Sequence, residues 1–271
     1  KAKEISEKPS KREMDMLLAT GEQVSEALLA MALNSLGQAS VSLTGPQAGV
    51  ETNGVYTKGK ILNIEPERVR QELDKGNIVV VAGFQGIDIN GDVNTLGRGG
   101  SDTSAVALAG ALKADVCEIY TDVDGVYSAD PRVVRAARKM QEITYNEMLE
   151  MARLGAVVMQ PRAVEMGKHY GIPIHVRSTF VGTPGTIIRE EYTVEEQDFI
   201  IRGVTHDTNV AKIAILGVPD LPGIAYKIFS GLAKANIDVD MIVQSIRNAD
   251  KNIIDLVFTI AKPDEQLRKL N

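Results

Sequence analysis

The spacing of apolar and polar residues predicts helices and strands in alternation over most of the chain. Apolar side chains at three- and four-residue intervals predict a helix over residues 14–36, which Gly37 would end. The continuous apolar run 77–83 is typical of a strand buried on both faces of a parallel sheet. The same patterns predict strands over 39–43, 115–120 and 172–177 and helices over 66–75, 101–113, 148–154 and 161–170. We therefore expect an α/β sandwich with a largely parallel sheet.

Residues typical of helix ends support these boundaries. Pro66 would open the helix over 66–75, and Gly76 would close it. Thr144 and Glu147 have the spacing of a capping box before the helix over 148–154.

The pattern changes beyond a polar stretch at residues 192–198, which predicts a linker. The next segments predict a strand over 211–218, a helix over 224–235, strands over 239–246 and 253–260, and a helix that begins at Pro263. This β-α-β-β-α order is that of a ferredoxin-like domain. We therefore expect two domains, 1–195 and 196–271.

Composition excludes several classes of protein. The chain has 271 residues, 44% of them hydrophobic and 24% charged, with a net charge of −6. It matches an ordinary globular protein, and its acidic balance argues against broad binding to a nucleic-acid backbone. No apolar run approaches the roughly 20 residues of a membrane span, and the charged start carries no secretory signal. The single cysteine, Cys117, excludes an internal disulfide and fits a reducing cytoplasm.

The segment 83–102, GFQGIDINGDVNTLGRGGSD, is the first candidate for chemistry. Gly97, Gly99 and Gly100 allow a tight turn and a close approach to a ligand. Ser101 is placed to cap the following helix, whose first N–H groups would attract an anion. Arg98 adds a guanidinium that matches a carboxylate or a phosphate. The alternative is a glycine-rich turn before an ordinary helix, and the pattern favours the anion site.

The segment 120–132, YTDVDGVYSADPR, is the second candidate. Asp122, Asp124 and Asp130 would suit Mg²⁺ or a ribose hydroxyl, and Arg132 would suit a phosphate. An acidic turn loop is the plainer alternative, and the residues alone slightly favour it.

Other candidates are weaker. Glu22 lies in an otherwise small and apolar stretch, where its carboxylate faces either a ligand or solvent. His169, His175 and His206 lack the spacing of metal ligands, so we expect no protein-built metal site. Cys117 lies in an apolar strand, which favours an inert core thiol.

Five segments resemble aspartokinases, which belong to the amino-acid kinase superfamily. They are KREMDMLLATGEQ (11–23), VAGFQGI (81–87), TLGRGGSDTSAVALA (95–109), YTDVDGVYSADPR (120–132) and YNEMLEMARLGA (145–156). Residues 215–244 resemble the ACT regulatory region of the same family. The resemblance covers essentially the whole chain and is greatest to the bacterial class inhibited by lysine, or by lysine and threonine together.

The resemblance implies a three-layer α/β sandwich followed by a ferredoxin-like ACT domain. It implies transfer of the γ-phosphoryl group of ATP, with Mg²⁺, to L-aspartate, which gives 4-phospho-L-aspartate on the route to lysine, threonine and methionine. Arg98 would bind the α-carboxylate, Glu22 would accept from the α-amino group, and Asp102 would orient the transferring groups. The acceptor pocket would be lined by Gly99, Gly100 and Ser101.

The same resemblance implies a nucleotide site and an effector site. Thr121 and Asp122 would contact the nucleoside, and Arg132 would point toward the phosphates. The residues along the nucleotide would be Tyr127, Ser128, Ala129, Asp130 and Pro131. Lysine, threonine or both would bind at Asp220, Pro222, Gly223, Ile224, Ala225 and Gln244, with subunits joined through ACT and kinase domains. From the residues alone, a structural Pro-Gly turn is the favoured interpretation of that last segment.

The chain also departs from the family pattern. The glycine-rich Lys-Phe-Gly-Gly loop, a further threonine that contacts aspartate, and the second ACT unit have no counterpart, and Val157 stands where some members have lysine. We expect a longer parent polypeptide, because the chain lacks an initial Met and stops where a helix would begin. A polypeptide that started at Lys1 would be inactive or severely impaired. The alternatives are another small-acceptor kinase (for uridylate, glutamate or acetylglutamate) and a non-catalytic, amino-acid-sensing fragment.

Overall fold

The structure is a computed structural model that describes residues 2–156, 158–192, 201–206, 210–234, 237, 239–248 and 252–261. The chain forms two compact units, Lys1–Thr205 and His206–Asn271. Several expectations lie outside the described residues: the boundary near residue 196, most of the linker, the position of Val157 and the helix start at Pro263.

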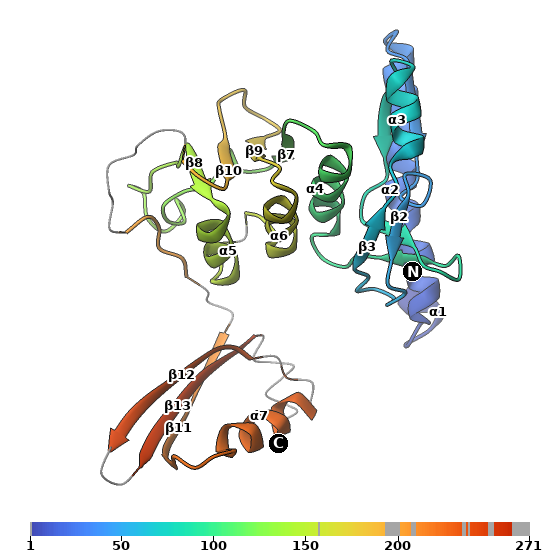
Figure 1. Cartoon of the computed structure of the whole chain (residues 1–271). Helices are drawn as coiled ribbons and strands as arrows, with labels where there is room; N and C mark the ends of the chain where they lie inside the picture. The colour runs from blue at the N-terminus through green and yellow to red at the C-terminus, as the bar shows by residue number, and fades with distance from the viewer. Residues whose placement is uncertain are drawn as a thin grey trace. The chain divides into compact units, whose positions relative to one another are not determined.

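The first half of unit one contains the long helix α2, two shorter helices and two small sheets (Figure 1). Its elements are α1 (Ala2–Ile5), α2 (Lys11–Ser35), β1 (Ser40–Leu43), β2 (Val50–Thr52), β3 (Ile61–Ile64), α3 (Glu67–Asp74), β4 (Ile78–Val81), β5 (Gln85–Ile87) and β6 (Val93–Thr95). Strand β1 pairs in parallel with β4, and a second sheet has the order β3-β2-β5-β6. Leu43, Ala48 and Val69 form the buried core behind the first pair.

The second half of unit one is a mixed sheet with helices. Its elements are α4 (Gly100–Leu112), β7 (Cys117–Thr121), β8 (Glu142–Thr144), α5 (Tyr145–Arg153), α6 (Pro161–Tyr170), β9 (Ile174–Ser178) and β10 (Thr186–Arg189). The strand order is β7-β9-β10-β8, with β7 parallel to β9 and β8 parallel to β10. Helices α5 and α6 lie side by side (Figure 1). Tyr145, Met148 and Ile174 are almost fully buried in the largest core of the chain.

Most of the predicted helices are confirmed, together with their ends. Gly37 and Gly76 each follow the C-cap residue of a helix, α2 and α3 respectively. Both adopt positive φ, a conformation in which glycine avoids the Cβ penalty. Thr144 and Glu147 form the predicted capping box, in which each side chain bonds the backbone of the other. Pro66 is the residue before α3 rather than its first residue.

One prediction about burial is wrong. Strand β4 was expected to be buried on both faces, but Ile78 is exposed and the other three residues are only half-buried. Within the described residues β4 pairs with β1 alone, so two strands cannot give it the cover of a broad parallel sheet.

Helix α2 is, among the described helices, the one long and apolar enough to cross a membrane by length and composition alone. Core helices of soluble proteins meet the same criterion. The face of α2 toward β6 carries Asp15, which is fully buried and bonds Thr95 of that strand. This helix therefore packs as part of unit one.

Unit two has the predicted β-α-β-β order. It contains β11 (Val210–Pro219), α7 (Ile224–Lys234), β12 (Val239–Asn248) and β13 (Ile253–Ala261). The three strands form an antiparallel sheet of order β11-β13-β12. Phe258 of β13 is buried and meets the ring of Phe229 of α7 edge-on, with 5.5 Å between ring centroids. This contact joins the helix to one face of the sheet.

Candidate functional site

The loop between β6 and α4 has a backbone that only glycine permits. Gly99 precedes the first residue of α4 in the left-handed conformation, with φ of 69°. A Cβ atom added to Gly99 would lie 1.8 Å from Cγ of Gln160, and one added to Gly100 would lie 2.8 Å from Phe84. Ser101 lies in the first turn of α4 and does not cap it, so that prediction is wrong. The tight turn at Gly99 takes the capping position instead.

The start of α4 can nevertheless receive an anion. The N–H of Gly100 donates to Gly97 at 3.1 Å, and that of Thr103 donates to Gly99 at 3.2 Å. Within the described part of the chain, the N–H groups of Ser101 and Asp102 have no acceptor. These two donors and the positive end of the helix dipole favour a negative ligand. Arg98 is exposed beside them and adds a full charge.

Asp102 lies in the same first turn and is partly buried. Burial raises the pKa of its carboxyl group above the ordinary value. Burial, and next the charge of Asp102, raises the pKa of the Cys117 thiol to about 11. Cys117 is therefore a protonated core thiol at neutral pH, as the sequence predicted.

Phe84 is a feature that sequence reasoning missed. It has φ of 68°, a conformation that is uncommon for any residue except glycine. Two hydrogen bonds hold this backbone conformation. The N–H of Phe84 donates to Oγ of Ser104 at 2.9 Å, and its carbonyl accepts from the N–H of Leu96 at 2.9 Å. Backbone strain that is held by the surroundings in this way often marks a functional site.

Two acidic residues lie one turn apart on α2. Glu22, the predicted ligand of the α-amino group, is half-buried. Glu26 was missed, although its spacing from Asp15 and Ala19 places it on the same helix face. Glu26 is 7% exposed, its Oε2 has no hydrogen-bond partner among the described residues, and burial raises its pKa.

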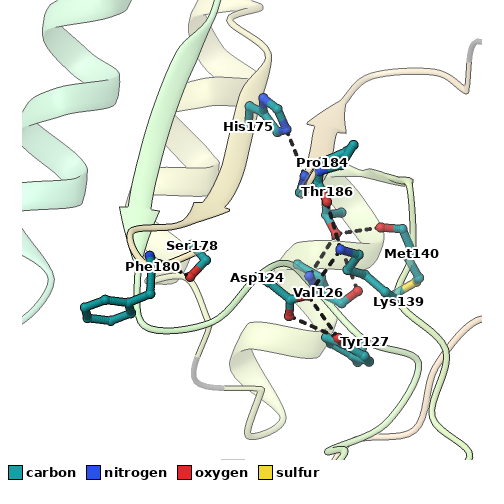
Figure 2. A network of polar contacts seen from close by, with 11 residues as sticks. Asp124, Val126, Tyr127, Lys139, Met140, His175, Ser178, Phe180, Pro184 and Thr186 are labelled. Carbon is teal, nitrogen blue, oxygen red and sulfur yellow. Dashed lines mark hydrogen bonds and ion pairs between the residues drawn. The ribbon is translucent and has the colours of Figure 1, made fainter. Parts of the chain in front are cut away.

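The segment after β7 is organised by Asp124. Its carboxylate accepts from the hydroxyl of Tyr127 at 3.0 Å and from Nζ of Lys139 at 3.2 Å. Burial opposes ionisation of Asp124, but these two hydrogen bonds outweigh it and lower its pKa. Figure 2 shows Lys139 between this carboxylate and the carbonyl of Pro184, to which it donates at 2.8 Å. Thr186 fixes the turn by accepting from the N–H of Val126 at 2.8 Å.

The remaining residues predicted to contact the nucleotide lie on either side of Asp124 in the same segment. The N–H of Ser128 donates to the carbonyl of Arg138 at 2.9 Å, and the N–H of Arg138 donates to Oγ of Ser128 at 3.0 Å. Ala129 is half-buried. Arg132 makes a bidentate pair with Asp130, with Nη2 to Oδ2 at 2.8 Å and Nε to Oδ1 at 3.0 Å, next to the exposed Pro131. Thr121 donates to the exposed carboxylate of Asp122 at 3.1 Å.

The three carboxylates of this segment do not converge on one point. Asp124 is engaged by Lys139, and Asp130 by Arg132. Among the residues that the structure describes, no group of three or more His, Cys, Asp or Glu side chains is arranged to hold a metal ion.

Comparison with known proteins identifies the family. Residues 1–178 match the model of the amino acid kinase family. The chain belongs to the amino acid kinase family. Residues 213–266 match the ACT domain, so the second unit is a domain of that kind.

Curated relatives of this amino acid kinase include aspartokinases. An aspartokinase of Bacillus sp. (strain MGA3) is 53% identical over 97% of this chain. The match spans 63% of that relative, so the chain is shorter than the curated proteins it matches.

Solved structures of an aspartokinase are also similar to this chain. E. coli aspartokinase III in complex with lysine and aspartate has a TM-score of 0.74 at 27% identity, over 96% of this chain and 60% of that one. The same enzyme with aspartate and ADP has a TM-score of 0.71 at 28% identity, over 93% and 56%.

The ACT domain presents a second helix start. Gly223 has φ of 86° and leads into α7, which begins with Ile224 and Ala225, and Asp220 and Pro222 are exposed on the turn before it. Within the described residues, the N–H groups of Ala225 and Tyr226 have no acceptor. Gln244 is exposed on β12. Strand β12 is at the edge of the described sheet and exposes Met241, Ile242, Val243 and Ile246.

A pocket that the sequence did not suggest borders the predicted nucleotide segment. Its lining includes Ser128, Arg138, Lys139, Glu142, Tyr192 and Arg202. The guanidinium of Arg202 lies 4.7 Å from the ring centroid of Tyr192, and the Tyr192 hydroxyl bonds Glu147. The N–H of Val204 donates to the carbonyl of Ser128 at 2.8 Å. The stretch 201–204 is therefore bound to the predicted nucleotide segment.

Proposed function

We propose that this chain carries a catalytic unit and a regulatory unit of an aspartate kinase. The reaction transfers the γ-phosphoryl group of ATP to the side-chain carboxylate of L-aspartate and gives 4-phospho-L-aspartate and ADP, the first step toward lysine, threonine and methionine. The observation that carries this proposal is the 53% identity with an aspartokinase over 97% of the chain. The anion site at the start of α4 supports it independently, because aspartate is an anionic acceptor.

In the acceptor site, the ligand of Arg98 is the α-carboxylate of aspartate, and the N–H groups of Ser101 and Asp102 lie at the same helix end. Glu22 accepts from the α-amino group. Gly99 and Gly100 line the pocket, since the absence of a Cβ atom leaves room for a close approach. The E. coli enzyme, whose structure contains aspartate, supports the choice of ligand.

In the nucleotide site, Thr121 and Asp122 contact the nucleoside, the segment from Tyr127 to Pro131 lies along the nucleotide, and Arg132 points toward the phosphates. The pair with Asp130 already holds the Arg132 guanidinium in a bidentate geometry, so a phosphate would compete with a carboxylate of similar shape. ADP in a structure of the E. coli enzyme supports an adenine nucleotide.

Mg²⁺ fits this site only as a partner of the nucleotide. Mg²⁺ usually binds one or two carboxylates together with substrate phosphates. The exposed carboxylate of Asp122 suits that mode, whereas a cage of three protein ligands is absent from the described residues. When bound, the ion supplies positive charge against the phosphates.

Catalysis then depends on position and charge. An ionised carboxylate is itself the nucleophile: one of its oxygens bonds the γ-phosphorus while the bond to the β-phosphate oxygen breaks, and ADP leaves with the electron pair. No general base is required. Asp102 orients the transferring groups from the first turn of α4, and Arg98 holds the acceptor in line with the phosphate.

We assign regulation to the ACT domain. Lysine, threonine or both would bind at Asp220, Pro222, Gly223, Ile224, Ala225 and Gln244, with the effector carboxylate at the start of α7. The exposed apolar side chains of edge strand β12 suit pairing with another ACT unit, which supports an oligomer. We place the functional boundary near residue 196 and the enzyme in the cytoplasm.

The test uses the complete natural polypeptide that contains this chain. We expect ATP-dependent aspartyl-hydroxamate formation in the presence of aspartate and hydroxylamine. At an aspartate concentration below the KM, Arg98→Ala should abolish most of it, whereas Arg135→Ala, which changes another exposed arginine of the same unit, should not. Transfer to uridylate or glutamate in place of aspartate would assign a different small-acceptor kinase. Binding of lysine without any turnover would assign a sensing protein.

A further inference from the structure

Asp15 is a buried carboxylate that no predicted role explains. It lies in α2 with no exposed surface. Its Oδ2 accepts from the N–H of Thr57 at 2.8 Å and from the N–H of Thr95 at 3.0 Å, and its Oδ1 accepts from the Thr95 hydroxyl at 2.7 Å. Three donors therefore converge on one side chain from two segments that are distant in the sequence.

Arg162 of α6 holds the same two segments. Its Nη1 donates to the carbonyl of Leu96 at 2.8 Å, and its Nη2 donates to the carbonyl of Gly59 at 2.9 Å. A backbone hydrogen bond from Gly59 to Thr95, at 2.8 Å, joins the segments directly. One anion and one cation, from two helices, thus bridge residues 57–59 to residues 95–96.

These contacts end where the anion-binding loop begins. Leu96 is followed by Gly97, Arg98 and Gly99. A Cβ atom on Gly97 would lie 2.9 Å from the carbonyl oxygen of Thr57, so the loop packs tightly against the bridged segment. A shift of residues 95–96 would move Arg98 and the first turn of α4 with them.

Charge-assisted hydrogen bonds in a buried site are short, directional and stronger than neutral ones. Asp15→Asn would keep the shape but turn one acceptor into a donor that faces other donors. Arg162→Lys would keep the charge but lose the planar fork that reaches two carbonyls at once.

We propose that Asp15 and Arg162 are positioning residues that fix the β6–α4 loop for binding of the anionic acceptor. We call these two residues the clamp. They touch no reacting atom and act through Thr95 and Leu96. The identity of the ligand as aspartate rests on the proposed function, whereas the effect on the loop does not.

The test compares Asp15→Asn and Arg162→Lys with Glu72→Gln in the complete natural polypeptide. Glu72 is a matched control, because it is also buried and hydrogen-bonded, by Lys75 and Asn77, but lies in α3 away from the loop. We expect both clamp variants to raise the KM for aspartate about 10- to 100-fold, with the KM for ATP changed less than about threefold. Glu72→Gln should leave both KM values unchanged even if it lowers the melting temperature.

Hydrogen exchange separates this proposal from the assignment of the ligand. The amides of Leu96 and Thr103 are hydrogen-bonded and should exchange faster in the two clamp variants than in the wild type or in Glu72→Gln. If the wild type does not bind aspartate but exchange at Leu96 responds, the proposed function fails and the clamp stands. Unchanged exchange in both clamp variants, or changes equal to those in Glu72→Gln, would overturn the clamp. Arg162→Lys provides the same test if Asp15→Asn does not fold.

Discussion

The two loops that we assign to the acceptor and to the nucleotide are held by different kinds of contact. The β6–α4 loop depends on Asp15 and Arg162, which lie 80 and 66 residues from their partners Thr95 and Leu96. In the segment after β7, Tyr127 bonds Asp124 three residues away, and Arg132 bonds Asp130 two residues away. The first loop therefore requires the assembled unit. In the second, Tyr127 and Arg132 are held by near neighbours, and Thr186, 60 residues from Val126, adds a long-range contact.

This difference has consequences for mutation. In the first loop, Gly99 and Gly100 combine backbone conformation, tight packing and the proposed ligand contact, so a substitution of either glycine should reduce stability and binding together. In the second loop the side chains are more exposed, so a substitution should affect binding with little loss of stability.

The largest expected effect is that of Gly99→Ala. The added Cβ would meet Gln160 at 1.8 Å, and φ of 69° is unfavourable for alanine. We expect a loss of about 2–3 kcal/mol in the free energy of unfolding and loss of aspartate-dependent activity. Gly91→Ala is the control: Gly91 has φ of 85° but nothing within 4 Å of the added Cβ, so about 1 kcal/mol should be lost. Denaturant unfolding of both variants measures the difference, and equal losses would contradict the packing argument.

Arg98→Ala should have the next largest effect, and on binding alone. The side chain is exposed, so the free energy of unfolding should stay within about 0.5 kcal/mol of the wild-type value. Loss of a charged hydrogen-bond donor should raise the KM for aspartate about 10- to 100-fold. Steady-state kinetics in the complete polypeptide checks this. A change confined to the KM for ATP would place Arg98 in the nucleotide site instead of the acceptor site.

Arg132→Ala tests the second loop in the same way. Its side chain is 88% exposed, so the pair with Asp130 should contribute little to stability. We expect the KM for ATP to rise about tenfold, with the KM for aspartate unchanged. If thermal unfolding shows that Arg132→Ala loses as much stability as Gly99→Ala, the proposed difference in stability between the two loops is wrong.

The smallest effect should be a pH dependence at Asp124. Its folded-state pKa is lowered, so its stabilising contribution is complete above its unfolded pKa and is lost as the pH falls through the folded value. The stability of the wild type relative to Asp124→Asn should therefore be greatest near neutral pH and should shrink below about pH 4. Urea unfolding of both proteins from pH 7 to pH 3 measures this difference in stability. A difference that grows on acidification would mean that folding raises the pKa of Asp124 rather than lowering it.

Much of the fold was predictable from local signals. Helix α6 was predicted at its observed bounds, Pro161–Tyr170, because a proline opens it and Gly171 closes it in the left-handed conformation. The β-α-β-β order of unit two was also predictable from its apolar runs. The short strands β2, β3, β5, β6, β8 and β10 were missed, because three or four residues each are too few to show a periodicity.

The site was only partly predictable. The glycines, Arg98 and the first turn of α4 formed a recognisable pattern, but Ser101 was wrongly expected to cap the helix. A side-chain cap and a glycine turn are alternative ways to begin a helix, and the packing of Gln160 against Gly99 belongs to the tertiary structure. The spacing of Glu26 along α2 indicated its helix face but not its burial, and Phe84 gave no local signal, since burial and strain depend on neighbours elsewhere in the chain.

The sequence by itself determined the elements, their order, the anion-attracting helix start and the resemblance to aspartokinases, because each depends on residues close together in the chain. Only the tertiary structure decided which polar groups meet. The approach of Asp15 to Thr95 joins residues 80 positions apart, and the approach of Arg162 to Gly59 joins residues 103 apart. Such contacts exist only after the helices have packed against the strands, so no local pattern records them.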